Sequence, residues 1–229
     1  MEEKKEYSPE EIAKRYNIDL EKLKKEQEKL AKSLSIKDNI DFSLIERAAG
    51  IENVFFKNRI ISAIVVLNLD CEIIEQEYFS DKIKFPYISG FRAYRELPCM
   101  VSAFNKLDEK PDVVFIHGNG ILHPRHLGLA SHFSLACNVP TIGISDSLLK
   151  DEEVEIKEDK IFLKGELCGK ILRTKEGSNP VYVSPGNMIS LDSSINLIKK
   201  FIREPHKLPE PLIKARKYAK EIMKELFKV

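Results

Sequence analysis

The sequence lacks the charge excess of a polycationic nucleic-acid-binding protein and the long apolar runs of a membrane-spanning protein. Its 229 residues include 37 Lys and Arg against 36 Asp and Glu, for a net charge of +1. Because the chain is not a general polycation, contact with nucleic acid would need a local basic face. No segment approaches the about 20 apolar residues of a membrane-spanning helix, and the first residues are charged. We therefore expect a soluble, cytoplasmic protein with no membrane association.

Cysteine is scarce, and no two cysteines form a CxxC pair. The four cysteines are Cys71, Cys99, Cys137 and Cys168. Most of them sit in or beside apolar runs, which is typical of reduced, buried thiols. A zinc site built from cysteine pairs is not expected.

The chain also has no internal repeat and no low-complexity linker. Residues 1–36 form a helical extension in which a capping signal at Ser8 opens one charged amphipathic stretch, 8–33. Residues 37–229 form the main domain. Its patterns predict strands at 45–56, 60–67, 71–78, 113–116, 139–144, 160–172 and 180–184, helices at 92–107, 126–137, 190–202 and 210–227, and an irregular segment at 145–160. Three strands followed by alternating helices and strands predict a single α/β domain with a mixed central sheet flanked by helices.

One predicted strand ends in an unexpected residue. The apolar run 113–116 stops at His117, and a turn through Gly118, Asn119 and Gly120 follows. Strand ends beside glycine-rich turns are where α/β proteins place reactive or ligand-binding side chains. His117 is therefore the first candidate for a functional residue.

Other candidates lie near this turn in the sequence. Tyr87, fixed after Pro86, is either an exposed ring that stacks on bases or a half-buried turn residue. Glu96 is either a metal ligand or an ordinary helix-surface glutamate, and His123 suits a ligand or a proton carrier. Two further histidines, His126 and His132, are six residues apart and do not form an HExxH pair, so we expect both on a helix surface.

Four longer motifs carry a resemblance that covers residues 49–211. They are PYISGFRAYRELP (86–98), PDVVFIHGNGILHPRHLGLASH (111–132), VPTIGIS (139–145) and RTKEGSNPVYVSPG (173–186). In content and order they resemble the endonuclease V family, repair nucleases that act beside deaminated purines. The resemblance implies an RNase H-like fold. It also implies a metal-dependent mechanism, in which acidic residues hold Mg²⁺ or Mn²⁺ against the scissile phosphate.

The resemblance also implies a route for base recognition. The family inserts a Pro-Tyr-Ile-Pro wedge into the nucleic acid and flips the inosine base into a tight pocket lined by loop glycines. Arg125 is a candidate for contact with phosphates. The residues matching the wedge and the pocket are Pro86, Tyr87, Ile88, Gly90, Gly118 and Gly120.

The catalytic positions depart from the family pattern. Glu52 replaces an aspartate, which moves the carboxylate by roughly one C–C bond length. His117 stands where the family has an aspartate, Asp146 where it has a lysine, and Arg216 where it has a histidine. The family's glutamate and histidine are retained as Glu96 and His123. Imidazole is a poorer ligand for Mg²⁺ than a carboxylate, and a softer divalent metal would accept it better. One hypothesis is that Asp146 restores the lost carboxylate, so that the metal ligands are Glu52, Glu96, His117 and Asp146.

Two functions remain open from the sequence. One is a protein, expected to be a monomer, that binds deaminated sites in DNA or RNA while cleavage is weakened, altered or lost. The other is an active metal-dependent endonuclease with a rebuilt site, in which Glu52, Glu96, His117 and His123 act in catalysis. A purely structural scaffold is disfavoured, because the glycines and the loop 86–88 that would bind a base are present.

Overall fold

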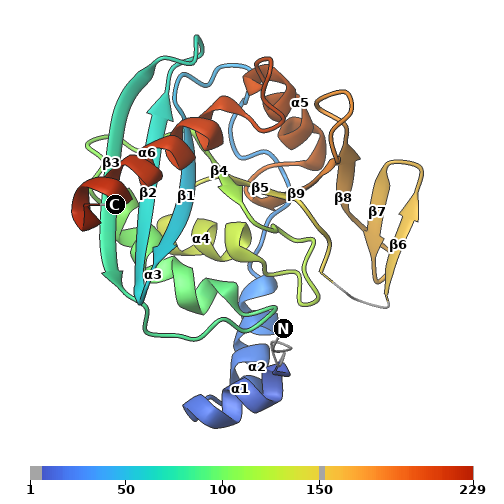
Figure 1. Ribbon diagram of the computed structural model, residues 1–229. Coiled ribbons are helices and arrows are strands. Elements are labelled where there is room, and N and C mark those ends of the chain that lie inside the picture. Colours follow the sequence, from blue (N-terminus) through green and yellow to red (C-terminus); the bar gives the residue numbers. More distant parts are fainter. Residues whose placement is uncertain (1–6, 150–152, 229) are drawn as a thin grey trace.

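A computed structural model describes residues 7–149 and 153–228 of the chain. Its centre is one mixed sheet with helices packed on both faces (Figure 1). The helices are α1 (Pro9–Tyr16), α2 (Leu20–Ala31), α3 (Arg92–Phe104), α4 (Leu129–Cys137), α5 (Leu191–Phe201) and α6 (Glu210–Phe227). The strands are β1 (Ala48–Phe56), β2 (Arg59–Leu67), β3 (Ile73–Lys82), β4 (Val113–His117), β5 (Thr141–Ser145), β6 (Val154–Lys157), β7 (Lys160–Leu163), β8 (Glu166–Leu172) and β9 (Val181–Asn187).

The strand order places the ends of β4 and β5 beside β1. The order across the sheet is β3-β2-β1-β4-β5-β9-β8-β7-β6. Strand β4 pairs in parallel with β1 on one side and with β5 on the other. Because these neighbours run in the same direction, the carboxyl ends of β4 and β5 meet beside the middle of β1, and such strand ends are where α/β proteins bind ligands.

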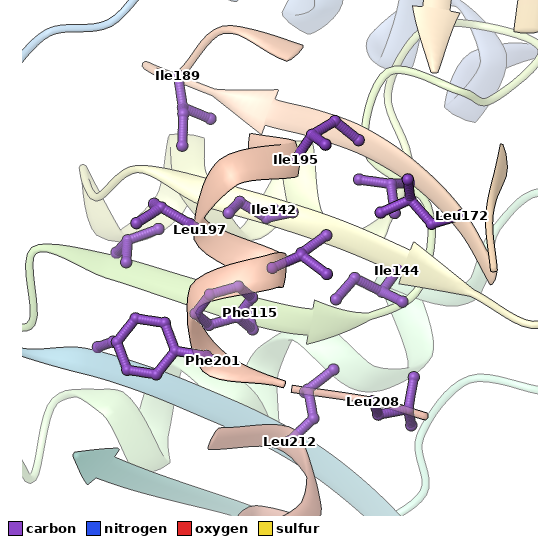
Figure 2. Packing of buried hydrophobic residues seen from close by; sticks show 14 of the residues in the cluster. Phe115, Ile142, Ile144, Leu172, Ile189, Ile195, Leu197, Phe201, Leu208 and Leu212 are labelled. Carbon is purple, nitrogen blue, oxygen red and sulfur yellow. The ribbon is translucent and has the colours of Figure 1, made fainter. Parts of the chain in front are cut away.

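Successive side chains of β4 pack under the helices on opposite faces of the sheet. Phe115 packs in the cluster of α5 and α6, and it meets the ring of Phe201 at 5.6 Å between centroids (Figure 2). The neighbouring Ile116 packs on the other face with α3 and α4, against residues such as Phe133. Successive side chains of a strand point to opposite faces, so a strand buried on both sides is apolar throughout. The mixed sheet flanked by helices is the expected fold class.

The N-terminal stretch forms two helices, not the single one expected. The chain turns at Asn17, whose left-handed backbone conformation (φ 52°) ends α1. Ser8 and Glu11 form the expected capping box, in which each side chain accepts a hydrogen bond from the other residue's backbone N–H. Both helices lie at the bottom of Figure 1, below α3 and α4, and bury Ile88 and Phe91 in a shared apolar cluster.

Three further expectations differ from the structure. The segment 145–160 was expected to be irregular, yet it contains β6, which pairs with β7 as a hairpin; residues 150–152 lie outside the described part. Helix α4 begins at Leu129, so His126 precedes it and adopts a positive φ of 51°. His132 is inside α4 but only 8% exposed, because this helix is apolar around most of its circumference. Neither histidine therefore lies on a helix surface.

Two expectations about composition hold for the described residues. Cys99, Cys137 and Cys168 are buried free thiols, and Cys71 is partly exposed and also free. Within 7–149 and 153–228, no helix combines the length and the apolar character needed to cross a membrane.

Candidate functional site

Three of the predicted metal ligands converge where β4 and β5 end beside the middle of β1. Nε2 of His117 lies 3.0 Å from Oδ2 of Asp146, and Nδ1 lies 3.2 Å from Oε1 of Glu52. The parallel register pairs Ile51 with Ile116, which sets Glu52 beside His117. The sheet therefore assembles Glu52, His117 and Asp146 into one cluster.

A guanidinium from α6 joins this cluster. Nη2 of Arg216 donates to Oε1 of Glu52 at 2.9 Å and lies 2.9 Å from Nδ1 of His117. A neutral His117 that accepts from Arg216 at Nδ1 carries its proton on Nε2 and donates to Asp146. Burial lowers the pKa of His117, but the hydrogen bond and charge of Glu52 outweigh it, so this pKa is raised.

The close approach of α6 depends on Gly50. A Cβ atom at this position would lie 2.2 Å from the backbone of Pro211. Any larger residue would therefore push the start of α6 away from β1. Glycine is required here by close packing, and this packing holds Arg216 over Glu52.

Asp146 has a cationic partner of its own, Lys207. Nζ of Lys207, in the loop between α5 and α6, lies 2.6 Å from Oδ1 of Asp146. Burial raises the pKa of Asp146, but the hydrogen bond from Lys207 and the charge of His117 outweigh it and lower this pKa. Asp146 is thus an ionised carboxylate with partners on both oxygens.

The fourth predicted ligand, Glu96, has partners of its own. It is 2% exposed, so it is not the surface glutamate that was one of the alternatives. Arg92 binds both of its oxygens, at 2.7 and 2.8 Å, and Nδ2 of Asn53 donates to Oε2 at 2.7 Å. Ser62 donates to Oδ1 of Asn53 and fixes its orientation. Glu96 is therefore held by a complete set of charge-assisted hydrogen bonds.

These contacts do not fit a divalent metal. Each of the carboxylates Glu52, Glu96 and Asp146 has an arginine or a lysine as its partner. Mg²⁺ prefers several hard oxygen ligands with free lone pairs and an excess of negative charge. Among residues 7–149 and 153–228, no group of three or more His, Cys, Asp or Glu side chains is arranged to hold a metal ion.

A cavity of about 140 Å³ opens beside this cluster. This volume is below the roughly 300–1,000 Å³ of pockets for drug-sized ligands, so only a small group fits. Two of the lining residues have a buried polar atom, Oδ1 of Asn119 and Oγ of Ser145, without a hydrogen-bond partner among the described residues. Buried polar groups without partners are rare, and these two side chains gain a partner if they turn toward a group in the cavity.

Of the residues expected to bind the base, some line the cavity and the others lie elsewhere. Tyr87, Gly90 and Gly118 line the cavity, and Tyr87 is 59% exposed, so its ring is available for stacking. Gly120 instead packs against β9, since a Cβ there would lie 2.1 Å from the carbonyl oxygen of Pro185. Ile88 is 1% exposed and anchors its loop in the interior. The neighbouring Pro86 is partly buried, on the far side of Tyr87 from the cavity, in a hollow beside α1.

His123 lines the cavity, and Arg125 binds the same loop carbonyl as His123. Nε2 of His123 lies 3.1 Å from the carbonyl oxygen of Gly90, and the backbone N–H of Arg125 donates to Nδ1. Burial and the charge of Arg125 lower the pKa of His123 to about 3, so the ring is neutral. Arg125, a candidate for phosphate contact, donates to the same carbonyl at 2.8 Å and to Oε1 of Gln27 at 2.6 Å.

Sequence reasoning missed four residues of this site. Arg92 stands one helical turn before Glu96, a spacing that allows an ion pair and could have been noticed. Gln27 interrupts an apolar stripe of α2 that includes Leu20 and Leu23, which is also a detectable signal. Asn53 and Lys207 gave no such signal, because only the sheet and the α5–α6 loop bring them to their partners.

Comparison with known proteins is consistent with this fold. The family described as Endonuclease V matches residues 28–217. Endonuclease V of Thermosipho melanesiensis is 40% identical over 186 residues, which cover 79% of this chain and 82% of that protein. The crystal structure of endonuclease V from Bacillus subtilis superposes with a TM-score of 0.85 at 30% identity, over 93% of this chain and 96% of that one.

A further solved structure contains nucleic acid. It is endonuclease V of Ciona intestinalis in complex with a 24mer DNA containing an inosine followed by a ribo-adenosine. It superposes with a TM-score of 0.83 over 90% of this chain and 98% of that one, and at 23% identity it supports the fold alone. The extent of the family match and the identity to the bacterial relatives establish that this chain, with its RNase H-like fold, belongs to the endonuclease V family.

Proposed function

We propose that this protein recognises deaminated purines, inosine above all, in DNA or RNA and that its cleavage of the phosphodiester bond is weak or lost. The observation that carries the proposal is a contrast within one site. The cavity beside Tyr87 has polar atoms without partners, whereas every carboxylate expected to hold a metal is paired with a cation.

Recognition is supported by the cavity and its neighbouring loop. An exposed aromatic ring on a loop anchored by a buried residue can stack on a base or fill the gap that a flipped base leaves. The cavity is small enough to select for the shape of a base. Asn119 and Ser145 line the cavity, and their unpartnered side-chain oxygens would bond the edge of that base after turning toward it. The inosine-containing DNA bound by the Ciona relative is consistent with this assignment.

Weak or lost cleavage is supported by the charges. Members of this family are metal-dependent nucleases. In this chain the positive charges of Arg216 and Lys207 already neutralise Glu52 and Asp146, so the attraction for a divalent cation is reduced. Arg92 and Asn53 hold Glu96, and its release would cost their hydrogen bonds.

A second candidate is the active nuclease with a rebuilt site. Its support is the convergence of Glu52, His117 and Asp146, with His117 within 3.2 Å of one carboxylate and 3.0 Å of the other. A metal at this point would have to displace Arg216 and Lys207. This requirement makes the second candidate weaker than the first.

A paired binding and cleavage assay separates the two. Single-stranded DNA and RNA oligonucleotides with one inosine are compared with otherwise identical adenosine controls, in EDTA and separately with Mg²⁺, Mn²⁺, Co²⁺ and Zn²⁺. We expect preferential binding of inosine in EDTA, with little or no product in any metal. Tyr87→Ala should lose the preference, while Leu44→Ala, which truncates another exposed apolar side chain, should keep it.

Two outcomes would contradict the proposal. Equal affinity for inosine and adenosine oligonucleotides would remove the recognition function. Efficient cleavage that is abolished by Glu52→Gln and by His117→Ala would establish the rebuilt nuclease instead.

A further inference from the structure

Helix α2 reaches the base pocket through one buried polar side chain, Gln27. This residue is 1% exposed and lines the cavity, although it precedes the part of the chain that matches the family. Its Nε2 donates to the carbonyl oxygen of Gly90 at 3.2 Å, and its Oε1 accepts from Nε of Arg125 at 2.6 Å. Both ends of the amide are therefore used, and the two bonds fix its orientation.

The carbonyl of Gly90 is held from three sides. In addition to Gln27, Nε2 of His123 lies 3.1 Å away and Nη2 of Arg125 lies 2.8 Å away. Gly90 has a φ of +77°, a conformation that glycine adopts without strain and other residues rarely adopt. These three donors therefore determine where the peptide between Gly90 and Phe91 points.

That peptide ends the loop that carries Tyr87. Ile88 and Phe91, on either side of Gly90, are buried against α1 and α2. The guanidinium of Arg125 lies over the ring of Phe91, 4.7 Å from its centroid. The hydroxyl of Tyr94, one turn into α3, donates to Glu26 or to the carbonyl oxygen of Leu23 on α2. The loop is thus attached to α2 by both apolar and polar contacts.

We infer that Gln27 is a positioning residue of the base pocket, which sets the selectivity for inosine by fixing Gly90 and, through it, the loop of Tyr87. This inference rests on the proposed function for the identity of the ligand. Gln27 acts through Gly90 and Arg125. Its removal should therefore reduce the discrimination between bases more than it reduces the attraction for the phosphate backbone, which depends on charge.

The first experiment measures discrimination. Full-length wild type, Gln27→Ala, Gln27→Glu and Lys25→Ala are titrated with the inosine and adenosine oligonucleotides in EDTA. Loss of one or two buried hydrogen bonds should lower the inosine-to-adenosine affinity ratio by about 5- to 50-fold in Gln27→Ala. Gln27→Glu, which keeps the acceptor for Arg125 but loses the donor to Gly90, should fall between Gln27→Ala and wild type. Lys25→Ala, an exposed position on the same helix, should keep the ratio.

The second experiment follows the loop without any nucleic acid. The sequence contains no tryptophan, so Tyr87→Trp introduces a single tryptophan, which is excited selectively at wavelengths where the remaining tyrosines do not absorb. In this background Gln27→Ala should lower the anisotropy of the tryptophan emission, and Lys25→Ala should leave it unchanged. A loss of global stability alone would not produce this change while the protein remains folded, which circular dichroism can verify.

The two experiments distinguish the possible failures. If wild type shows no preference for inosine, the proposed function fails, and the anisotropy still decides whether Gln27 positions the loop. If wild type prefers inosine and Gln27→Ala keeps the ratio within twofold, the inference about Gln27 is wrong. Unchanged anisotropy in Gln27→Ala would also overturn it.

Discussion

Arg216 and Glu52 are 164 positions apart in the sequence, yet Nη2 of one lies 2.9 Å from Oε1 of the other. Through this contact the last helix neutralises a carboxylate that is 6% exposed in the middle of β1. The same guanidinium reaches Nδ1 of His117, so it joins β1 to the end of the neighbouring strand β4. A buried ion pair of this kind is costly to break, because removal of one partner leaves the other charge unpaired.

Replacement of Arg216 should therefore destabilise the fold. Arg216→Met keeps most of the apolar stem but leaves Glu52 buried without its cation, and we expect a loss of about 2 kcal/mol in the free energy of unfolding. Urea denaturation measures this loss. Lys217→Met, an exposed neighbour on α6, serves as the control and should change stability by less than about 0.5 kcal/mol. Equal effects of the two substitutions would contradict the role assigned to the ion pair.

Divalent metal should not stabilise the wild-type protein. A ligand that binds only the folded state raises the melting temperature by mass action, so absence of binding predicts no shift when Mn²⁺ is added. In the double variant Arg216→Ser/Lys207→Ser the carboxylates Glu52 and Asp146 lose their cations. We expect Mn²⁺ to raise its Tm by about 2–4 °C for each kcal/mol of binding energy.

Thermal unfolding followed by circular dichroism, with and without EDTA, checks this prediction. Lys217→Ser/Lys220→Ser removes the same charge from the exposed side of α6 and should gain no response. An EDTA-reversible rise in the Tm of the wild type would show that the native cluster binds metal after all.

His123 should make stability depend on pH. Its folded-state pKa is lowered to about 3 by burial and by Arg125, below its ordinary value of 6.5. As the pH falls below 6.5 the unfolded chain takes up a proton at this ring, and the folded chain does not until about pH 3. Stability is therefore lost toward acid over this window, by up to about 1.4 kcal/mol per pH unit from this group.

Two measurements test the titration of His123. His123→Gln should flatten the acid side of the curve of unfolding free energy against pH. In the folded wild type, the NMR signals of the His123 ring should not titrate between pH 8 and about pH 5. A midpoint within this range would show that the ring is not held neutral by its surroundings.

The position of α6 should depend on Gly50. Gly50→Ala places a methyl group about 2.2 Å from the backbone of Pro211, so the helix has to move. Overpacking of this kind costs about 3 kcal/mol, and we expect that loss in urea denaturation. A loss below about 0.5 kcal/mol would contradict the close contact between α6 and β1.

The sequence by itself determined the central strands, the glycine turn and the identity of the altered residues, but not β6. The apolar run before His117 marks β4 because a strand buried on both faces needs apolar residues at every position. The motifs around Tyr87, His123 and Gly177 identify the family by their order alone. Helix boundaries were less certain, as α1 and α2 show, since the left-handed turn at Asn17 leaves the helical periodicity almost uninterrupted.

Only the tertiary structure decided which partner each functional residue has. Gln27 meets the carbonyl of Gly90 across 63 positions, and Lys207 meets Asp146 across 61. Local periodicity predicts the face of a helix or strand on which a side chain lies, but not the element that packs against that face. The pairing of cations with carboxylates, which sets the charge of this site, depends on such packing and could not be derived from the residues alone.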